Sequence, residues 1–314
     1  MFSKGSLPSR KVGLRRKQIF QNVLLAAVLV IFLSLVPVVY IRARDRWSGN
    51  EVRELQALFE SGDFEGACAQ SGELLEQRPM DLFLLTLNGF SSYQLAISQI
   101  NSFDTLSYID NSIWALRRAM LLKEGAFDGR ILYVLGKAYY HKGSDCADLA
   151  VRYLNEARAA GFTAPDIPEY LGLAYAALRD YTSSIAAFSQ SMAAEEGRGT
   201  SDVLLLSIAR SYFSLNELES AKTYLVRCLE VSMDSRTRTT ARLLLGDILF
   251  QTGEISGAEA ELLAIIAEGG ENADVRYQLG VLYASMGDTT RARAEWRSAL
   301  RIDPAHSLAR NRLM

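Results

Sequence analysis

The sequence has 314 residues, of which 49% are hydrophobic and 22% are charged, and its formal net charge is −2. It contains six prolines, a composition that favours a mostly helical chain. Only two histidines are present, and neither lies with cysteines or acids at a metal-ligand spacing. There is no glycine-rich phosphate loop and no nucleophile with a base to activate it. We therefore expect no metal ion, no cofactor and no enzymatic activity.

The N-terminal region combines a basic tail with a long apolar segment. Residues 1–18 contain six Lys or Arg and no acid, and residues 23–41, VLLAAVLVIFLSLVPVVYI, contain no charge. At about 1.5 Å per residue, these 19 residues span roughly 28 Å, close to the hydrocarbon thickness of a bilayer. The sequence thus predicts a single transmembrane helix over 19–41 and a linker over 42–47. A cleaved signal peptide is the alternative, but its apolar region is usually shorter and no clean small-x-small cleavage site follows.

The charges around this segment predict its orientation. Six cations precede the segment and three follow it, which favours a cytoplasmic N-terminus and places the rest of the chain outside the cytoplasm, in the periplasm if the source is a bacterium. The reverse topology, with the rest of the chain in the cytoplasm, remains the alternative. Residues 1–46 carry a net charge of +8, so the remainder carries −10. This acidic part argues against a nucleic-acid partner and against its lying flat on anionic lipid.

The C-terminal region contains a helix–turn–helix pattern over residues 277–304. An apolar stripe at helical spacing is interrupted at Gly287 and Asp288, and a second apolar stripe ends before Pro304. The pattern predicts two antiparallel helices joined by a tight turn.

The same pattern recurs 34 residues earlier, where Gly246 corresponds to Gly280 and Ala258 corresponds to Ala292. More degenerate copies lie further upstream. A fixed period of this size indicates a repeat array. Because small side chains allow helices to approach, we expect the two helices of the last copy to cross at Gly280 and Ala292.

The last copy, residues 273–306, resembles a unit of the tetratricopeptide repeat family. The resemblance implies an all-α fold, in which helical hairpins stack into a right-handed superhelix, an α-solenoid, here preceded by the transmembrane helix. Residues 307–314 are expected to start a capping helix. Seven positions carry the resemblance: Leu279, Gly280, Tyr283, Ala292, Trp296, Ala299 and Pro304. The array covers 48–306 in about seven units: 48–81, 82–128, 129–164, 165–198, 202–235, 239–272 and 273–306.

Two units depart from the period. The unit 82–128 has 47 residues, with about 13 extra ones around 95–107. Their mixed apolar spacing predicts that they lengthen both helices, the alternative being a disordered lid. The unit 129–164 has two extra residues near Ser144–Cys146.

The family resemblance implies that the first helix of each unit lines a concave groove. The positions one and four residues after the crossing residue of each first helix face that groove. Of the six positions that lie four residues after a crossing residue, four are aromatic. We expect these aromatic rings to be partly exposed and, with the cations among them, to anchor an extended or helical peptide. The alternative is that they pack against the helices of the next unit. The predicted partner-binding groove consists of Phe90, Tyr93, Tyr133, Lys137, Tyr140, Arg210, Phe213, Asp247 and Phe250.

The three cysteines, Cys68, Cys146 and Cys228, lie in separate units. Their odd number and separation argue against a disulfide framework. Cys228 occupies a small-residue position of a second helix, which predicts a buried apolar side chain rather than a reactive thiol.

Together these features predict a membrane-anchored, non-enzymatic scaffold that binds protein or peptide partners in its groove. Its layout resembles that of bacterial inner-membrane members of the family, which suggests a subunit of a larger envelope, secretion or motility assembly. The alternatives are a membrane-tethered adaptor facing the cytoplasm and an enzyme whose site is shared between repeats.

Overall fold

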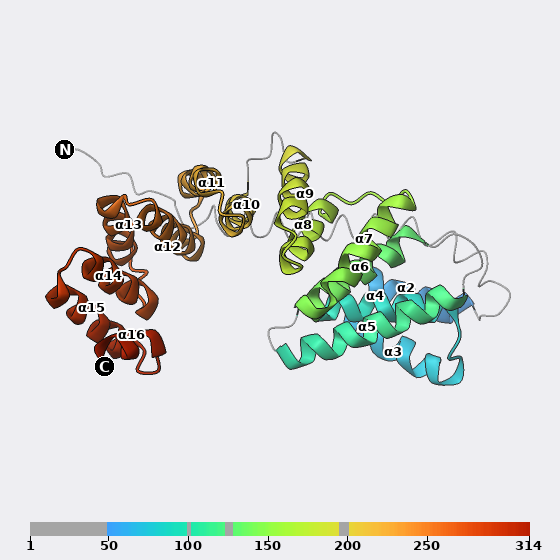
Figure 1. Ribbon diagram of the computed structural model, residues 1–314. Helices are drawn as coiled ribbons and strands as arrows, with labels where there is room; N and C mark the ends of the chain where they lie inside the picture. The colour runs from blue at the N-terminus through green and yellow to red at the C-terminus, as the bar shows by residue number, and fades with distance from the viewer. Residues whose placement is uncertain (1–48, 99–101, 123–127, 195–200) are drawn as a thin grey trace, which may run out of the picture. The chain divides into compact units, whose positions relative to one another are not determined.

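The computed structural model describes residues 49–98, 102–122, 128–194 and 201–314. Within these ranges all regular secondary structure is helical, which confirms the expected all-α fold (Figure 1). None of the helices in these ranges is long and apolar enough to cross a membrane. The predicted basic tail, transmembrane helix and linker lie outside the described residues.

The chain divides into two compact units, residues 1–163 and 164–314, which we call the N-terminal and C-terminal units. In each unit, consecutive helices pair as antiparallel hairpins (Figure 1). The helices of the N-terminal unit are α2 (Gly49–Glu60), α3 (Phe64–Gln77), α4 (Leu82–Ser98), α5 (Ser102–Leu122), α6 (Gly129–Lys142) and α7 (Ala147–Ala159). Those of the C-terminal unit are α8 (Ile167–Ala177), α9 (Tyr181–Ala194), α10 (Asp202–Ser214), α11 (Leu218–Val231), α12 (Ser235–Gln251), α13 (Ile255–Ala267), α14 (Ala273–Ser285), α15 (Thr289–Ile302) and α16 (Ser307–Leu313).

The two departures from the period have different structures. Helices α4 and α5 have 17 and 21 residues, against 12 to 14 in the hairpins on either side, so the prediction that the insertion lengthens both helices is confirmed. The two extra residues of the next unit form a short 3₁₀ helix, η1 (Ser144–Cys146). Helix α12 also begins four residues before its predicted unit, because the Asp234 side chain caps it by accepting a hydrogen bond from the Thr237 amide at 2.9 Å.

The turn within the last hairpin requires a residue with positive φ. Gly287 has φ +80°, and the following Asp288 amide donates to the Tyr283 carbonyl at 2.9 Å, which closes the end of α14. The Asp288 carboxylate then accepts from the Arg291 amide at 2.9 Å and starts α15. In the Gly-Asp pair of the sequence pattern, Gly287 thus ends the first helix of the hairpin and Asp288 starts the second.

The first helix of a hairpin receives a large side chain of the second helix at its crossing glycine. A Cβ on Gly172 would lie 2.6 Å from the Phe188 ring, and one on Gly280 would overlap the indole of Trp296. The sequence pattern did not predict that Trp296 lies against Gly280. Ala292 is fully buried, but the glycine makes room for the tryptophan four residues later, because the larger side chain fills the space between the helices.

A polar layer lies inside the N-terminal unit between α3, α4 and α5. Asn88, which is buried, donates to the Ser71 hydroxyl at 3.0 Å and to the Cys68 carbonyl at 3.0 Å. The Asn111 side-chain amide donates to the side-chain Oδ1 of Asn88 at 3.0 Å and to the Ser92 hydroxyl at 2.7 Å. These hydrogen bonds offset the cost of burying the amides and link three helices.

Glycine substitutions in α14 and α12 test the packing at the crossing. We expect Gly280→Ala to destabilise the chain by about 1–3 kcal/mol, because the added methyl group displaces the Trp296 indole. Gly246→Ala is the matched control, since its Cβ would lie 3.6 Å from Leu262, an ordinary contact. This control should stabilise α12 by about 0.5–1 kcal/mol through helix propensity. Urea unfolding followed by circular dichroism measures both changes, and equal effects would contradict this account of the crossing.

Candidate functional site

In the C-terminal unit, the predicted groove residues occupy one face of two neighbouring first helices. Helix α10 contacts α12, and each presents two of the residues one helical turn apart. Arg210 is exposed, whereas Phe213, Asp247 and Phe250 are half-buried. We call these four residues the C-terminal groove face.

The two aromatic residues of this face are anchored by the core beneath them. Phe213 and Phe250 both pack against the buried cluster that includes Ala209, Leu245 and Leu249. Each ring is therefore held on one side and accessible on the other. The expected partial exposure is confirmed for these two residues, and also for Tyr140 of the N-terminal unit.

Asp247 is the charged residue of this face that burial affects most. Desolvation raises the pKa of its carboxyl group above the usual 3.8. None of the hydrogen bonds or ion pairs among the described residues involves Asp247. A half-buried carboxylate in this position is costly by itself, and a cation brought by a ligand would offset that cost.

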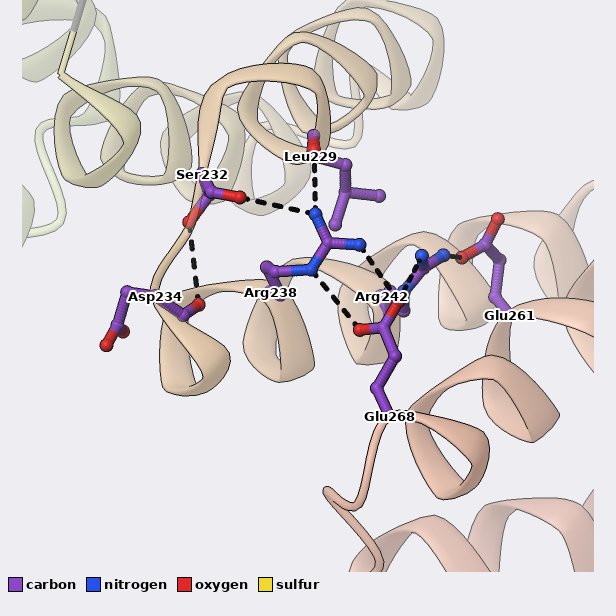
Figure 2. A network of polar contacts seen from close by, with 7 residues as sticks. All are labelled: Leu229, Ser232, Asp234, Arg238, Arg242, Glu261 and Glu268. Carbon is purple, nitrogen blue, oxygen red and sulfur yellow. Dashed lines mark hydrogen bonds and ion pairs between the residues drawn. The ribbon is translucent and has the colours of Figure 1, made fainter. Parts of the chain in front are cut away.

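An arginine network holds α12 against the preceding helix (Figure 2). Arg238 lies in the first turn of α12, and its guanidinium donates to the Leu229 carbonyl at 3.0 Å and to the Ser232 carbonyl at 3.2 Å. These two carbonyls belong to the last turn of α11 and its C-cap. The guanidinium thus satisfies carbonyl groups that a helix end leaves unpaired.

The same network ties α12 to α13 (Figure 2). The Glu268 carboxylate accepts from Arg238 at 2.9 Å and from Arg242 at 2.8 Å, and Arg242 also pairs with Glu261. Hydrogen bonds from the two guanidinium groups lower the pKa of Glu268 from 4.5 to about 2. The network therefore holds two helices, α11 and α13, against α12, which carries Asp247 and Phe250. The sequence contains one signal for this arginine network, two arginines four residues apart in a first helix. The groove prediction did not include them.

In the N-terminal unit, most of the predicted groove residues do not form a surface. Phe90, Tyr93, Tyr133 and Lys137 are buried, so the expectation of a partly exposed aromatic is wrong for Tyr93. The physical reason lies in α4, which carries no charge and buries thirteen of its 17 residues. A helix that is apolar around most of its circumference is enclosed by its neighbours and leaves no open face.

The buried lysine of this unit lies among aromatic rings. Lys137 Nζ donates to the Tyr133 hydroxyl at 3.0 Å and lies 4.9 Å and 5.6 Å from the ring centroids of Tyr133 and Tyr93. Such contacts stabilise a desolvated ammonium group. Burial and the nearby Lys137 charge lower the pKa of His141 from 6.5 to about 4, so this imidazole is neutral at physiological pH.

The potential metal ligands and the cysteines are the remaining groups with reactive side chains. No three His, Cys, Asp or Glu side chains there are placed to hold a metal ion. All three cysteines are free, as the sequence predicts, and Cys228 is fully buried. Burial raises the pKa of the Cys228 thiol to about 11, which keeps it protonated and unreactive.

Replacing Glu268 tests the lock around α12. We expect Glu268→Gln to lower the free energy of unfolding by about 1 kcal/mol at pH 7, a modest value because the side chain is 38% exposed. Since the folded pKa is depressed, the stabilisation is complete above about pH 4.5 and is lost as the pH falls towards 2. Urea unfolding of the wild type and of Glu268→Gln should show that the difference in their free energies of unfolding shrinks as the pH is lowered from about 4.5 towards 2. The control, exposed Glu230→Gln, should show no such pH dependence, and a constant difference for Glu268→Gln would contradict the lock.

Comparison with known proteins agrees with this architecture. Residues 169–313 match the family model of the tetratricopeptide repeat-like domain. The C-terminal part of a TPR repeat-containing protein from Cytophaga hutchinsonii has a similar structure, with a TM-score of 0.60 and 15% identity over 83% of this chain and 99% of that chain. PilW, a type IV pilus biogenesis factor, gives a TM-score of 0.56 with 15% identity over 72% of this chain and 98% of that chain. PilF of Pseudomonas aeruginosa gives 0.53 with 14% identity over 71% and 95%.

No curated protein sequence matches this chain. The solved structures share its fold at identities that show the fold alone. The family model covers most of the C-terminal unit, and the hairpins of the N-terminal unit follow the same pattern. The chain therefore has the fold of tetratricopeptide repeat proteins, and its residues 169–313 match the family model of that repeat.

Proposed function

We propose that this chain is a non-enzymatic scaffold that binds a peptide segment of a partner protein on the C-terminal groove face. The observation that carries the proposal is Asp247, a half-buried carboxylate with no hydrogen bond or ion pair among the described residues. It lies on the same face as the accessible rings of Phe213 and Phe250. Anchored aromatics beside an unsatisfied charge are typical of residues that dominate binding energy.

The chemistry of this face restricts the partner segment. A Lys or Arg of the peptide would pair with Asp247, and apolar side chains would pack on the two rings. An acidic group would meet exposed Arg210. An extended or helical peptide with a cation, an apolar residue and an acid fits this pattern. Because the Arg238–Glu268 network already holds α12 in place, binding costs little conformational entropy in this helix.

The proposal includes a membrane anchor. We infer that residues 19–41 cross a membrane with the N-terminus in the cytoplasm, so that the repeats lie outside it as part of an envelope, secretion or motility assembly. The support is the length of the uncharged segment and the excess of cations before it. An anchored scaffold would hold its partner near the membrane.

Asp247→Asn separates a binding role from a structural one. The substitution removes a charge that is costly to bury, so we expect the thermal stability at pH 7 to stay the same or rise slightly. The stability difference should close as the pH falls through the raised pKa of Asp247, because the wild-type carboxyl group is then also neutral. Partner binding should weaken at least about tenfold, which corresponds to losing a charge-assisted hydrogen bond of about 1.4 kcal/mol.

Partner binding is measured by crosslinking, with the photoreactive amino acid benzoyl-phenylalanine at position 213 of the full-length chain in its native membrane. Crosslinked partners are identified by mass spectrometry, and Asp247→Asn should reduce their yield. Exposed Glu219→Gln on α11 is the matched control, and a crosslinker at exposed Val226 of the same helix reports background. Unchanged crosslinking in Asp247→Asn, or equal yields from positions 213 and 226, would show that this face does not bind the partner.

The topology has its own test. A C-terminal alkaline phosphatase fusion, which is active only outside the cytoplasm, should be active, and the matching green fluorescent protein fusion should be dark when exported unfolded. We expect deletion of 19–41 to abolish phosphatase activity because export is lost. A bright fluorescent fusion with an inactive phosphatase fusion would establish the cytoplasm-facing adaptor instead.

A further inference from the structure

Helix α5 carries a row of exposed apolar side chains. Leu106, Trp114 and Leu121 are 47%, 47% and 81% exposed. Their spacing of eight and seven residues places them on one side of the helix. The row extends over 16 residues, and the first and last are about 22 Å apart along the helix at about 1.5 Å per residue. This is the second helix of its hairpin in the N-terminal unit, so the row is separate from the C-terminal groove face.

The tryptophan of this row is held in place by an arginine. The Arg118 guanidinium lies 4.4 Å from the Trp114 ring centroid, and its Nη2 lies 3.2 Å from the sulfur of Met80. Met80 is itself 50% exposed and adds apolar surface beside the ring. A stacked, ordered tryptophan loses little side-chain entropy when a ligand covers it. Tryptophan and arginine are also the residues most enriched among those that dominate interface energies.

The charges of α5 indicate what this face attracts. Arg117 is exposed and Arg118 is half-buried, and neither belongs to an ion pair with a described carboxylate. Asp110, which follows Leu106 by one turn, is already paired with Lys142 at 2.7 Å. Arg117 lies close enough to the Tyr139 hydroxyl to donate a hydrogen bond to it, but no described carboxylate neutralises either arginine. The charge beside the tryptophan is therefore positive, in a chain whose residues after 46 carry a net charge of −10.

We propose that the exposed face of α5 docks an acidic amphipathic helix of a partner protein. The apolar stripe of that helix covers Leu106, Trp114 and Leu121, and its carboxylates pair with Arg117 and Arg118. About four turns of helix match the length of the row. Covering the tryptophan strengthens the ion pairs, because it excludes water from the guanidinium groups.

Selection from a peptide library tests both the surface and the charge of its occupant. The probes are displayed 21-residue helices with leucines at i, i+3, i+4 and i+7 and with Asp, Glu, Lys or Arg randomised at the polar positions. They are selected on the purified full-length chain after depletion on the Trp114→Ala variant. We expect the enriched peptides to be acidic, and to bind Trp114→Ala and the double variant Arg117→Glu/Arg118→Glu at least tenfold more weakly.

Two further variants test whether peptide binding depends on the exposed face of α5. Leu263→Ala removes an apolar side chain of similar exposure, 44%, from α13 and should change binding less than twofold. Leu121→Glu changes an 81% exposed position that the fold does not need, so it should weaken binding without lowering the melting temperature. The proposal is overturned if no peptide is enriched over the depleted variant, if the enriched peptides are basic or uncharged, or if phosphatidylglycerol vesicles bind α5 in a Trp114-dependent way.

Discussion

The packing within the hairpins depends on one contact, in which a large side chain of the second helix lies against the crossing glycine of the first. Phe188 lies against Gly172 and Trp296 against Gly280 in this way. The contact determines how closely the two helices of a hairpin approach, and so which residues of the first helix remain to face a ligand. Each hairpin is complete only when its neighbour covers the remaining apolar face, which is why the units occur as an array.

Much of the fold could be predicted because its repeating contacts impose a repeating sequence. The turn at Gly287 and Asp288 and the spacing to Gly246 identify the hairpins without any knowledge of their packing. The contact of Trp296 with Gly280 was not predicted, because sequence spacing shows that Ala292 and Trp296 both lie inside but not that the indole lies against the glycine.

The candidate site could be predicted only where the chain keeps its regular period. In the C-terminal unit, the positions expected to face a ligand, such as Phe213 and Asp247, are indeed accessible. In the N-terminal unit, the same positions in α4 are enclosed, because that helix is long, uncharged and packed on nearly all sides. A period identifies a face of a helix, whereas the accessibility of that face depends on the neighbouring helices. The Arg238–Glu268 ion pair joins residues 30 positions apart, so the sequence shows the two arginines of α12 but not which carboxylate they pair with.

The polar layer around Asn88 has a consequence for how the chain assembles. Similar hairpins can pack on one another in a wrong order, since each offers nearly the same apolar surface. Helix α4 instead offers an amide that needs the partners which α3 and α5 supply through Ser71 and Asn111. Against any apolar hairpin those amide groups would be buried without hydrogen bonds, at a cost of about 1–3 kcal/mol each. The layer thereby favours the native neighbours α3, α4 and α5 over other pairings of hairpins, and it fixes their register.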